Sequence, residues 1–477
     1  MLSITPLLER MQGTPLYIQL YSYIRSGIEG GSLPAGEALP SIRQLAQHLG
    51  ISKNTVESAY GQLVAEGYLE NRERAGYLIL PLEQFPYGIA PAQVPANGVK
   101  KPVSTQQPHA AVQYDFHYGD IAFDRFPHSL WKSCVTEALS ADYVHVLGYG
   151  NRMGHPGLRE EIAEYVYQSR GVICEANQII ISAGTQHLMS VLVQLLQLSN
   201  ETIAMEEPGY SGVKSVLRNL GCTLISIEVE SDGIDVSQLG DTENVKLVYV
   251  TPSHQFPLGM VMPIQKRYRL LQWATERGSY VLEDDYDSEY RYSSAPIPAL
   301  KALDSNDRVI YMGTFSKSFL PSARLSYAIL PHSLLNTCGE KLTFLSPSVS
   351  PLIQEAVWLF MKKGHFARHL RRMRRVYQAR HKALTEAIQE VFGDQCGIIG
   401  DSSGMHLLLD VKGRQASELI PLAERFGCRV YPPDKHWNIP SDCPESYIML
   451  GFGGLDERRL QEGIQQLGRA WLTSSFV

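Results

Sequence analysis

The sequence predicts a mostly α winged helix-turn-helix domain at the N-terminus, an α/β domain with a mostly parallel sheet, and a small α+β domain at the C-terminus. Short helical patterns fill the first eighty residues, a proline-rich stretch follows, and strand-like runs then alternate with helices, as in βαβ units. At 477 residues the chain exceeds one ordinary core. We expect a winged helix at 1–80, a linker at 81–111, a large domain at 112–345 and a small domain at 346–477.

Composition describes a globular protein, with 44% hydrophobic residues and a net charge of −6 that does not by itself indicate nucleic acid. The first thirteen residues lack the apolar core of a signal peptide, and no apolar run reaches membrane-spanning length. The seven cysteines are odd in number and scattered, which argues against disulfides and against a zinc site. We therefore expect a cytoplasmic protein without a metal and without a membrane partner.

Apolar residues with helical spacing at 15–28 predict a first helix. Ser41 can cap a second helix and Ser52 a third, and the turn at Gly50 joins these two. Two short helices with such a turn have the spacing of a helix-turn-helix. Residues 67–79 then predict a hairpin, the wing.

The third helix would present polar residues at its N-terminal end, where such helices meet bases and phosphates in the major groove. Arginines of the second helix and the wing could contact the DNA backbone. The predicted DNA-binding residues are Arg43, Ser52, Lys53, Asn54, Thr55, Arg72 and Arg74. Six basic and seven acidic residues lie within 1–80, so charge does not decide between DNA binding and a helical protein-contact module.

Four motifs favour DNA binding: Pro15-Leu16-Tyr17, the Leu-Pro-Ser-Ile-Arg-Gln-Leu-Ala run at 39–46, Ser-Lys-Asn-Thr-Val at 52–56, and Glu-Gly-Tyr-Leu at 66–69. Together they resemble the winged-helix domain of GntR-type bacterial repressors, over essentially the whole segment. The resemblance implies double-stranded operator DNA as a partner. Residues 81–111, with six prolines, predict a semi-extended tether behind this domain.

Strand-like runs organise the large domain, and ligands of such sheets bind beyond the carboxyl ends of the strands. The expected strands are 178–182, 202–205, 223–227, 246–250, 280–283, 308–312 and 325–330. Gly184 and Thr185 follow the first strand and open a helix, which suits a phosphate, although an ordinary strand-to-helix turn would look the same. No dinucleotide fingerprint or P-loop is present.

The stretch 280–324 carries the main chemical signal. Glu283, Asp284 and Asp285 close one buried strand, and Lys317 follows the next across a Gly-Thr-Phe-Ser turn. Such a lysine is typical of a reactive amine rather than a solvated one. A phosphate cup, an aromatic platform, a buried acid and a lysine together suggest pyridoxal 5'-phosphate.

From about residue 115 to the C-terminus the chain resembles a fold-type-I aminotransferase, and the whole chain resembles the MocR/GabR subgroup of GntR regulators. This similarity implies that Lys317 forms the Schiff base, Asp284 pairs with the ring nitrogen, Tyr286 contacts the ring hydroxyl and Tyr210 stacks on the ring. The implied phosphate cup consists of Gly184, Thr185, Gln186, Thr314 and Arg324. Tyr149 would reach the phosphate of the neighbouring subunit in a homodimer. Glu283 and Asp285 are expected to be structural.

The chain departs from the aminotransferase pattern in two places. Where an Asn-Pro-x-Gly loop usually holds the ring hydroxyl, residues 254–259 read His-Gln-Phe-Pro-Leu-Gly, so that contact must come from His254 or Gln255, or be absent. His254 would contact a ligand or stabilise the turn. Met449 stands at the place of the arginine that grips a substrate carboxylate, and methionine cannot do so.

The GABA-sensing relatives place acid-gripping arginines where this chain has Gly212 and, approximately, Lys435. The effector is therefore not expected to be GABA, and Lys435, His436 or Arg429 would grip a different acid. Residues 364–384 form the densest basic stretch, which could contact DNA, but a solvated or interdomain helix is favoured.

These features predict a bacterial transcription regulator that binds pyridoxal phosphate through Lys317 and senses the cofactor or an amino compound. The alternative is an active aminotransferase with an autoregulatory DNA-binding domain. Met449 and the altered loop favour the regulator. A third reading, a cofactor-free dimerisation scaffold, is disfavoured by Lys317, Asp284 and Arg324.

Overall fold

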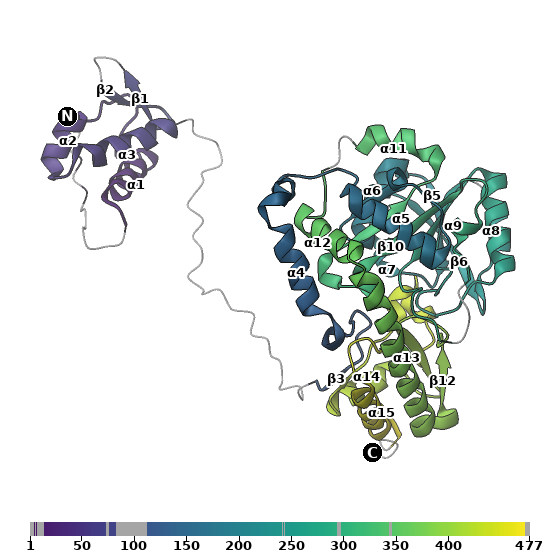
Figure 1. The fold of residues 1–477 in the computed structure, drawn as a ribbon. Helices are drawn as coiled ribbons and strands as arrows, with labels where there is room; N and C mark the ends of the chain where they lie inside the picture. Colours follow the sequence, from purple (N-terminus) through teal and green to yellow (C-terminus); the bar gives the residue numbers. More distant parts are fainter. Residues whose placement is uncertain are drawn as a thin grey trace. The chain divides into compact units, whose positions relative to one another are not determined.

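The structure is a computed structural model that describes residues 4, 6, 14–72, 76–82, 112–240, 242, 244–292, 297–342 and 346–472. The chain divides into two compact units, residues 1–105 and 106–477 (Figure 1). Among the described residues, no helix combines the length and the apolar character that crossing a membrane requires.

The first unit is a three-helix domain with a hairpin. Its elements are α1 (Leu16–Glu29), α2 (Ile42–Leu49), α3 (Lys53–Ala65), β1 (Leu69–Arg72) and β2 (Gly76–Ile79). Ser41 Oγ accepts the Gln44 N–H at 3.3 Å and Ser52 Oγ accepts the Thr55 N–H at 3.1 Å, so both predicted caps are confirmed. Gly50 ends α2 in the left-handed region, at φ 62°.

The core of this unit is formed by one face of each helix. Leu20, Ile24, Val56 and Leu63 are fully buried, and buried Tyr60 donates its hydroxyl proton to Pro40 O at 3.0 Å. The two strands pair antiparallel. The predicted winged helix-turn-helix is confirmed.

The second unit is built on an eight-stranded sheet of order β4-β11-β10-β9-β8-β5-β6-β7. Its strands are β4 (Ile179–Ser182), β5 (Thr202–Glu207), β6 (Thr223–Glu230), β7 (Gly233–Ile234), β8 (Val245–Val250), β9 (Tyr280–Asp285), β10 (Val309–Thr314) and β11 (Ser326–Ile329). Neighbours pair in parallel except around β11 and at β7. The mostly parallel sheet and its seven expected strands are confirmed, and only the two-residue β7 was not predicted.

Helices cover both faces because residues alternate along the buried strands. On β10, Ile310 and Met312 pack with α6 and α7, whereas Val309 and Tyr311 face the opposite layer. The large-domain helices are α4 (His128–Ala138), α5 (Pro156–Arg170), α6 (Thr185–Leu196), α7 (Ser211–Asn219), α8 (Ile264–Arg277), α9 (Leu300–Leu303), α10 (Phe315–Ser318), α11 (Leu335–Leu342) and α12 (Pro351–Lys362). The last of these lies beyond the expected boundary at residue 345, because α12 packs against α4 and α5.

The small domain has its own antiparallel sheet and core. It contains α13 (His365–Phe392), β12 (Cys396–Ile399), β13 (His406–Val411), α14 (Ala416–Arg425), β14 (Cys428–Arg429), β15 (Tyr447–Gly451) and α15 (Glu457–Leu472). The long α13 leads from α12 to β12 and packs along α15 (Figure 1). A short strand, β3 (Tyr114–Asp115), pairs with β14, so this segment joins the small domain. The predicted α+β character is confirmed.

Candidate cofactor-binding site

A cavity of about 300 Å³ opens beyond the carboxyl ends of β8, β9 and β10. This is where parallel sheets are expected to bind ligands. It is lined by Tyr118, Gly119, Thr185, Gln186, Tyr210, Tyr249, Thr251, Phe256, Asp284, Tyr286, Thr314, Ser316, Lys317 and Arg324. Most of the predicted cofactor contacts are therefore brought together, from strands more than one hundred residues apart.

Lys317 lies on the short helix α10, directly after β10. Its Nζ donates to Tyr118 O at 2.8 Å and lies 3.7 Å from the centroid of the Tyr118 ring. Burial lowers the pKa of this amine to about 8. Roughly a tenth of the amine is then unprotonated at pH 7, which is the form that can attack a carbonyl carbon.

Asp284 is the last residue but one of β9, and its buried side chain lines the cavity. Its Oδ2 accepts the Tyr249 hydroxyl proton at 2.5 Å, whereas no described residue contacts its Oδ1 within hydrogen-bond distance. Burial raises the pKa of Asp284 to about 7. A buried acid with one unused oxygen fits a protonated ring nitrogen of a bound cofactor. Tyr249 was not predicted, because a tyrosine within an apolar strand gives no separate signal.

A cradle for an anion lies at the start of α6. Gly184 precedes this helix at φ 91°, and a Cβ there would lie 2.4 Å from Arg324 Nη2. Only glycine leaves room for the guanidinium beside the first turn of α6, whose free N–H groups begin at Thr185, so that both sets of donors can point at one anion. Gln186 and Thr314 line the same end of the cavity. The residues present fit the phosphate group of pyridoxal phosphate.

His254 is buried behind the cavity and lines neither it nor the cavity described next. Its Nδ1 lies 3.1 Å from both carboxylate oxygens of Asp287 and 2.9 Å from Tyr286 Oη. Because a carboxylate only accepts, Nδ1 carries the proton, and the Tyr286 hydroxyl donates to His254 O at 2.8 Å. The structure thus places His254 as a support of Tyr286 rather than against an effector.

The loop that departs from the aminotransferase pattern brings neither expected amide nor imidazole to the cavity. Gln255 is buried and its Nε2 donates to Pro208 O at 2.9 Å and to Phe256 O at 2.8 Å. Phe256 lines the cavity in their place. Tyr286, directly after β9, also lines this cavity.

A second cavity, of about 370 Å³, adjoins the first and shares Tyr118, Gly119, Gln186, Tyr210 and Phe256 with it. Its remaining lining residues are His117, Ser211, Gly212, Tyr431, Pro432, Lys435, His436 and Met449.

The polarity and charge of this second cavity depend mainly on three lining residues, Met449, Lys435 and His436. Met449 is 4% exposed and packs in one cluster with Phe256, so the inner end is apolar. Lys435 is exposed at the rim, and burial lowers the pKa of His436 to about 3, which keeps it neutral. Arg429 does not line the cavity, because it pairs with Asp115 at 3.5 Å.

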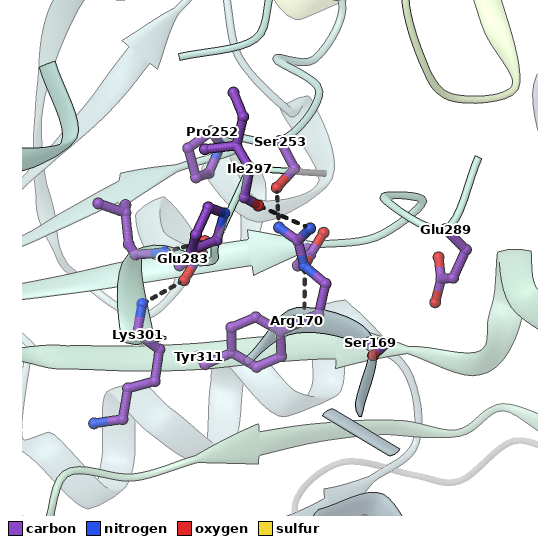
Figure 2. Close-up of polar contacts among 12 residues, drawn as sticks. Ser169, Arg170, Pro252, Ser253, Glu283, Glu289, Ile297, Lys301 and Tyr311 are labelled. Atoms are coloured by element: carbon purple, nitrogen blue, oxygen red, sulfur yellow. Dashed lines mark hydrogen bonds and ion pairs between the residues drawn. The ribbon is translucent and has the colours of Figure 1, made fainter. Parts of the chain in front are cut away.

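The neighbouring acids of β9 are structural, as expected. Figure 2 shows Glu283 accepting the Leu300 and Lys301 N–H groups, at 2.8 and 2.9 Å. Asp285 Oδ2 accepts from Arg170 Nε at 2.6 Å and from the Tyr311 hydroxyl at 2.7 Å. Both acids are therefore held in place by protein donors.

Two groups of histidines and acids lie close enough to share an ion, namely His145, His155 and Glu355, and His254, Asp287 and His406. In the first group, His155 Nδ1 accepts the Leu158 N–H at 2.9 Å. The proton is then on Nε2, which faces Glu355 Oε2 at 2.9 Å and has no lone pair for a metal. The absence of a metal site stays a prediction.

The predicted DNA-contact residues lie mostly on the surface of the winged helix. Arg43, Lys53 and Asn54 are exposed, and Thr55 is half-buried against the Ser52 cap. Arg72 is exposed and pairs with Glu70 at 2.8 Å. Arg74 lies outside the described residues. Of the arginines of α13, Arg380 is buried, and the others, Arg368, Arg371, Arg372, Arg374 and Arg375, are exposed.

Tyr149 lies apart from the cofactor cavity of its own chain and is 91% exposed. Leu139, Val144 and Leu147, which precede it, are also exposed. This concentration of exposed apolar side chains is typical of a protein–protein interface.

Comparison with known proteins agrees with both units. Residues 16–79 match the gntR family of bacterial regulatory proteins, and residues 121–442 match aminotransferase class I and II. The uncharacterized HTH-type transcriptional regulator YdeL of Bacillus subtilis is 40% identical over 98% of this chain and all of its own length. The probable rhizopine catabolism regulatory protein MocR of Rhizobium meliloti is 34% identical, over 98% of this chain and 95% of its own.

A solved structure supports the larger unit. LysN, an α-aminoadipate aminotransferase of Thermus thermophilus complexed with N-(5'-phosphopyridoxyl)-L-leucine, aligns with a TM-score of 0.67 and 26% identity, over 75% of this chain and 92% of its own. Fold and site therefore define a DNA-binding winged helix joined to an aminotransferase-type domain, a fold that implies pyridoxal phosphate. The chain belongs to the GntR family of transcriptional regulators, in its MocR-type group.

Proposed function

We propose that this protein is a transcription regulator that holds pyridoxal phosphate on Lys317 and changes its affinity for operator DNA when an amino compound binds. One observation carries the proposal: Lys317 and Asp284 line one cavity, in a chain that also carries a winged helix. The intact cradle at Gly184 and Arg324 supports it.

When bound, pyridoxal phosphate supplies an aldehyde that condenses with primary amines. Lys317 would hold that carbon, since its lowered pKa makes the free amine available. Asp284 Oδ1 would accept the ring N–H, and Tyr286, steadied by His254, would contact the ring hydroxyl. Tyr210 would cover one face of the ring, and Arg324 would bind the phosphate.

The second cavity supports a sensor more than a catalyst. Transamination of an α-amino acid needs a cation that fixes the carboxylate beside the reacting amine. The inner end of this cavity holds Met449, and the cation that lines it, Lys435, is at the rim. The proposed effector is therefore a primary amine with an apolar or hydroxylated body, whose acid group, if present, reaches outward to Lys435.

A homodimer belongs to the same proposal. Tyr149 and the exposed Leu139, Val144 and Leu147 would bury apolar surface against a second copy. Tyr149 would then reach the cofactor phosphate of the partner. Two winged helices in one dimer would bind two DNA half-sites, which raises affinity and specificity.

The cofactor claim is tested by adding pyridoxal phosphate to the purified full-length protein. The wild type is expected to develop a visible absorbance band that survives gel filtration, and Lys317→Ala is expected to lose it. Lys435→Ala is the matched control and should keep the band. A wild type that stays colourless after reconstitution would contradict the proposal.

The alternative, an active aminotransferase, is supported by Lys317, Asp284 and Arg324, which line the same cavity. An enzyme and a sensor differ in whether they catalyse multiple turnovers of transamination. A panel of amino acids and amines, each with 2-oxoglutarate or pyruvate as acceptor, should change the spectrum of the sensor without multiple turnovers. Catalytic keto-acid production, abolished in Lys317→Ala, would establish the enzyme instead.

A further inference from the structure

The second cavity, which adjoins the cofactor cavity, is walled largely by rings. Its aromatic and imidazole side chains are those of His117, Tyr118, Tyr210, Phe256, Tyr431 and His436. The cavity measures about 370 Å³. A protein cavity of about 150 Å³ already admits benzene, so a ligand with a six-membered ring can be accommodated here.

Phe256 lies among these rings and is 3% exposed. Its ring centroid is 4.7 Å from that of His436, at an interplanar angle of 82°, and 5.6 Å from that of Tyr210, at 86°. Tyr118 lies 5.1 Å away at a smaller tilt of 40°. Aromatic rings favour edge-to-face packing, because the positive edge of one ring meets the negative face of another. A ring carried by a ligand would extend the same pattern.

Several polar groups around the cavity are already bonded within the protein. Tyr431 donates its hydroxyl proton to Asp115 Oδ1 at 2.7 Å, and Asp115 does not line the cavity. Gln186 Nε2 donates to a main-chain oxygen at 3.3 Å. His436 Nδ1 accepts the Ser211 N–H at 3.5 Å, and burial lowers the pKa of this histidine to about 3, so its ring is neutral. The body of a ligand therefore meets neutral ring surface on this side.

Gly212 and Met449 keep charge away from the inner part of the cavity. A Cβ on Gly212 would lie 2.7 Å from Tyr210 Cζ and 2.9 Å from Gln186 Nε2, so no longer side chain fits there while Tyr210 lies as observed. Met449 is 4% exposed and contributes a thioether, which packs favourably against aromatic rings. Among the lining residues only Lys435, at the rim, is a lysine or an arginine.

Building on the proposed function, we infer that the effector is a primary amine with an aromatic ring, and that this ring packs against Phe256, Tyr431 and Met449. Its amino group would point toward Lys317 in the cofactor cavity, which shares Phe256 with the second cavity. A carboxylate on the same molecule would reach Lys435. A saturated ring of the same size would fill the space without a quadrupole, so the cavity selects for aromaticity as well as for size.

The test compares ligands that differ in aromaticity but hardly in size. Full-length protein is reconstituted with pyridoxal phosphate, freed of excess cofactor by gel filtration, and titrated with 2-phenylethylamine and with 2-cyclohexylethylamine. A second pair, L-phenylalanine and β-cyclohexyl-L-alanine, carries a carboxylate in addition. The change in the visible band gives an apparent Kd for each ligand, expressed as the concentration of free amine.

In the wild type, the aromatic member of at least one pair is expected to bind at least about threefold more tightly than its saturated partner. A preference in the amine pair identifies an aromatic amine. Tighter binding of L-phenylalanine that Lys435→Ala weakens identifies an aromatic amino acid. Phe256→Leu should lower the preference to below about twofold. Phe426→Leu, at a 38% exposed position that lines neither cavity, should keep it.

Equal binding of the aromatic and saturated members in both pairs overturns the inference, and so does a full preference in Phe256→Leu. The comparison within the wild type decides if Phe256→Leu does not retain the cofactor. Equal binding leaves the proposed function standing, because the band still responds to amines. A protein without the band, or with a band that no amine changes, overturns the proposed function and the inference with it.

Discussion

At the scale of single residues, β9 presents three consecutive acids with different partners. Glu283 and Asp285 have their charges met by main-chain N–H groups, Arg170 and Tyr311. Asp284, which of the three lines the cofactor cavity, has an oxygen without a partner among the described residues, as Asp285 does, and its pKa rises to about 7 because the charged form is buried. The buried carboxylate therefore has a free-energy cost, which a hydrogen bond from a cofactor N–H group would reduce.

This burial predicts a pH dependence of the cofactor-free protein. The folded-state pKa of Asp284 lies above its unfolded value, so the folded chain holds a proton that the unfolded chain releases. The contribution of Asp284 to the free energy of unfolding then falls as pH rises from about 4 to about 7. Urea unfolding at several pH values should show a shallower fall in Asp284→Asn than in wild type. An unchanged profile, matching that of the exposed control Asp442→Asn, would contradict it.

Gly404 gives a second prediction at this scale. A Cβ there would lie 2.0 Å from the His254 ring and 2.6 Å from Asp287 Oδ2, so Gly404→Ala should displace the pair that supports Tyr286. We expect weaker cofactor binding and a shifted visible band. Gly413→Ala is the control, because Gly413 has a similar φ of 72° but open space around it. Equal effects of the two substitutions would mean that backbone strain alone is responsible.

The sequence alone predicted the site residues that lie at or just after the ends of strands. Asp284 and Thr314 lie at the ends of their strands and Lys317 follows one, and these ends converge at one edge of a mostly parallel sheet. Tyr249 and Tyr118 could not be found in this way. Their positions depend on the pairing of β8 with β9 and on a segment 199 residues from Lys317.

At the scale of elements, the starts of two helices matter most. The start of α6 has the N–H groups proposed to bind a phosphate, and the start of α3 has the surface proposed to contact DNA. Ser52 satisfies a free N–H of α3 through its bond to Thr55 N at 3.1 Å. The element and its function therefore depend on one hydroxyl group.

The hydrogen bond between Ser52 Oγ and the Thr55 N–H predicts that Ser52→Ala destabilises the winged-helix unit. The free energy of unfolding of the winged-helix unit should fall by about 1 kcal/mol, because one orphan donor loses its partner. Chemical denaturation and DNA affinity are the measurements. Ser58→Ala, at an exposed position within α3, should change stability by less than about 0.5 kcal/mol. Equal losses in the two variants would argue against the cap.

Strands and helices were predicted where local patterns are strong. The buried β-branched runs of the large sheet can be recognised in the sequence alone. In contrast, β7, β3 and β14 are two-residue strands that form only through tertiary pairing. The basic helix α13 shows another limit. Its sequence does not reveal that Arg380 turns inward to Asp124 and the Gly453 carbonyl, or that Arg374 borders a cavity.

At the scale of the whole molecule, one chain carries a GntR-type winged helix and an aminotransferase-type domain. Regulation needs the two sites to be coupled, and coupling is a free energy that works in both directions. Typical values are about 1–3 kcal/mol, or about 5- to 150-fold in affinity. Because the proposed link between ligand and DNA runs through Lys317, removing this amine should uncouple the sites without damaging either the fold or the winged helix.

The central claim is tested by the DNA affinity of wild type and Lys317→Ala, measured by fluorescence anisotropy on genomic fragments that the protein itself protects. Each protein is titrated without ligand, with pyridoxal phosphate, and with pyridoxal phosphate plus each member of a panel of primary amines. We predict at least a fivefold change in the wild-type Kd on adding cofactor or amine, and in Lys317→Ala an unliganded affinity like wild type and no response. A wild-type Kd that stays constant in all conditions, or a Lys317→Ala variant that responds as fully as wild type, would contradict the account.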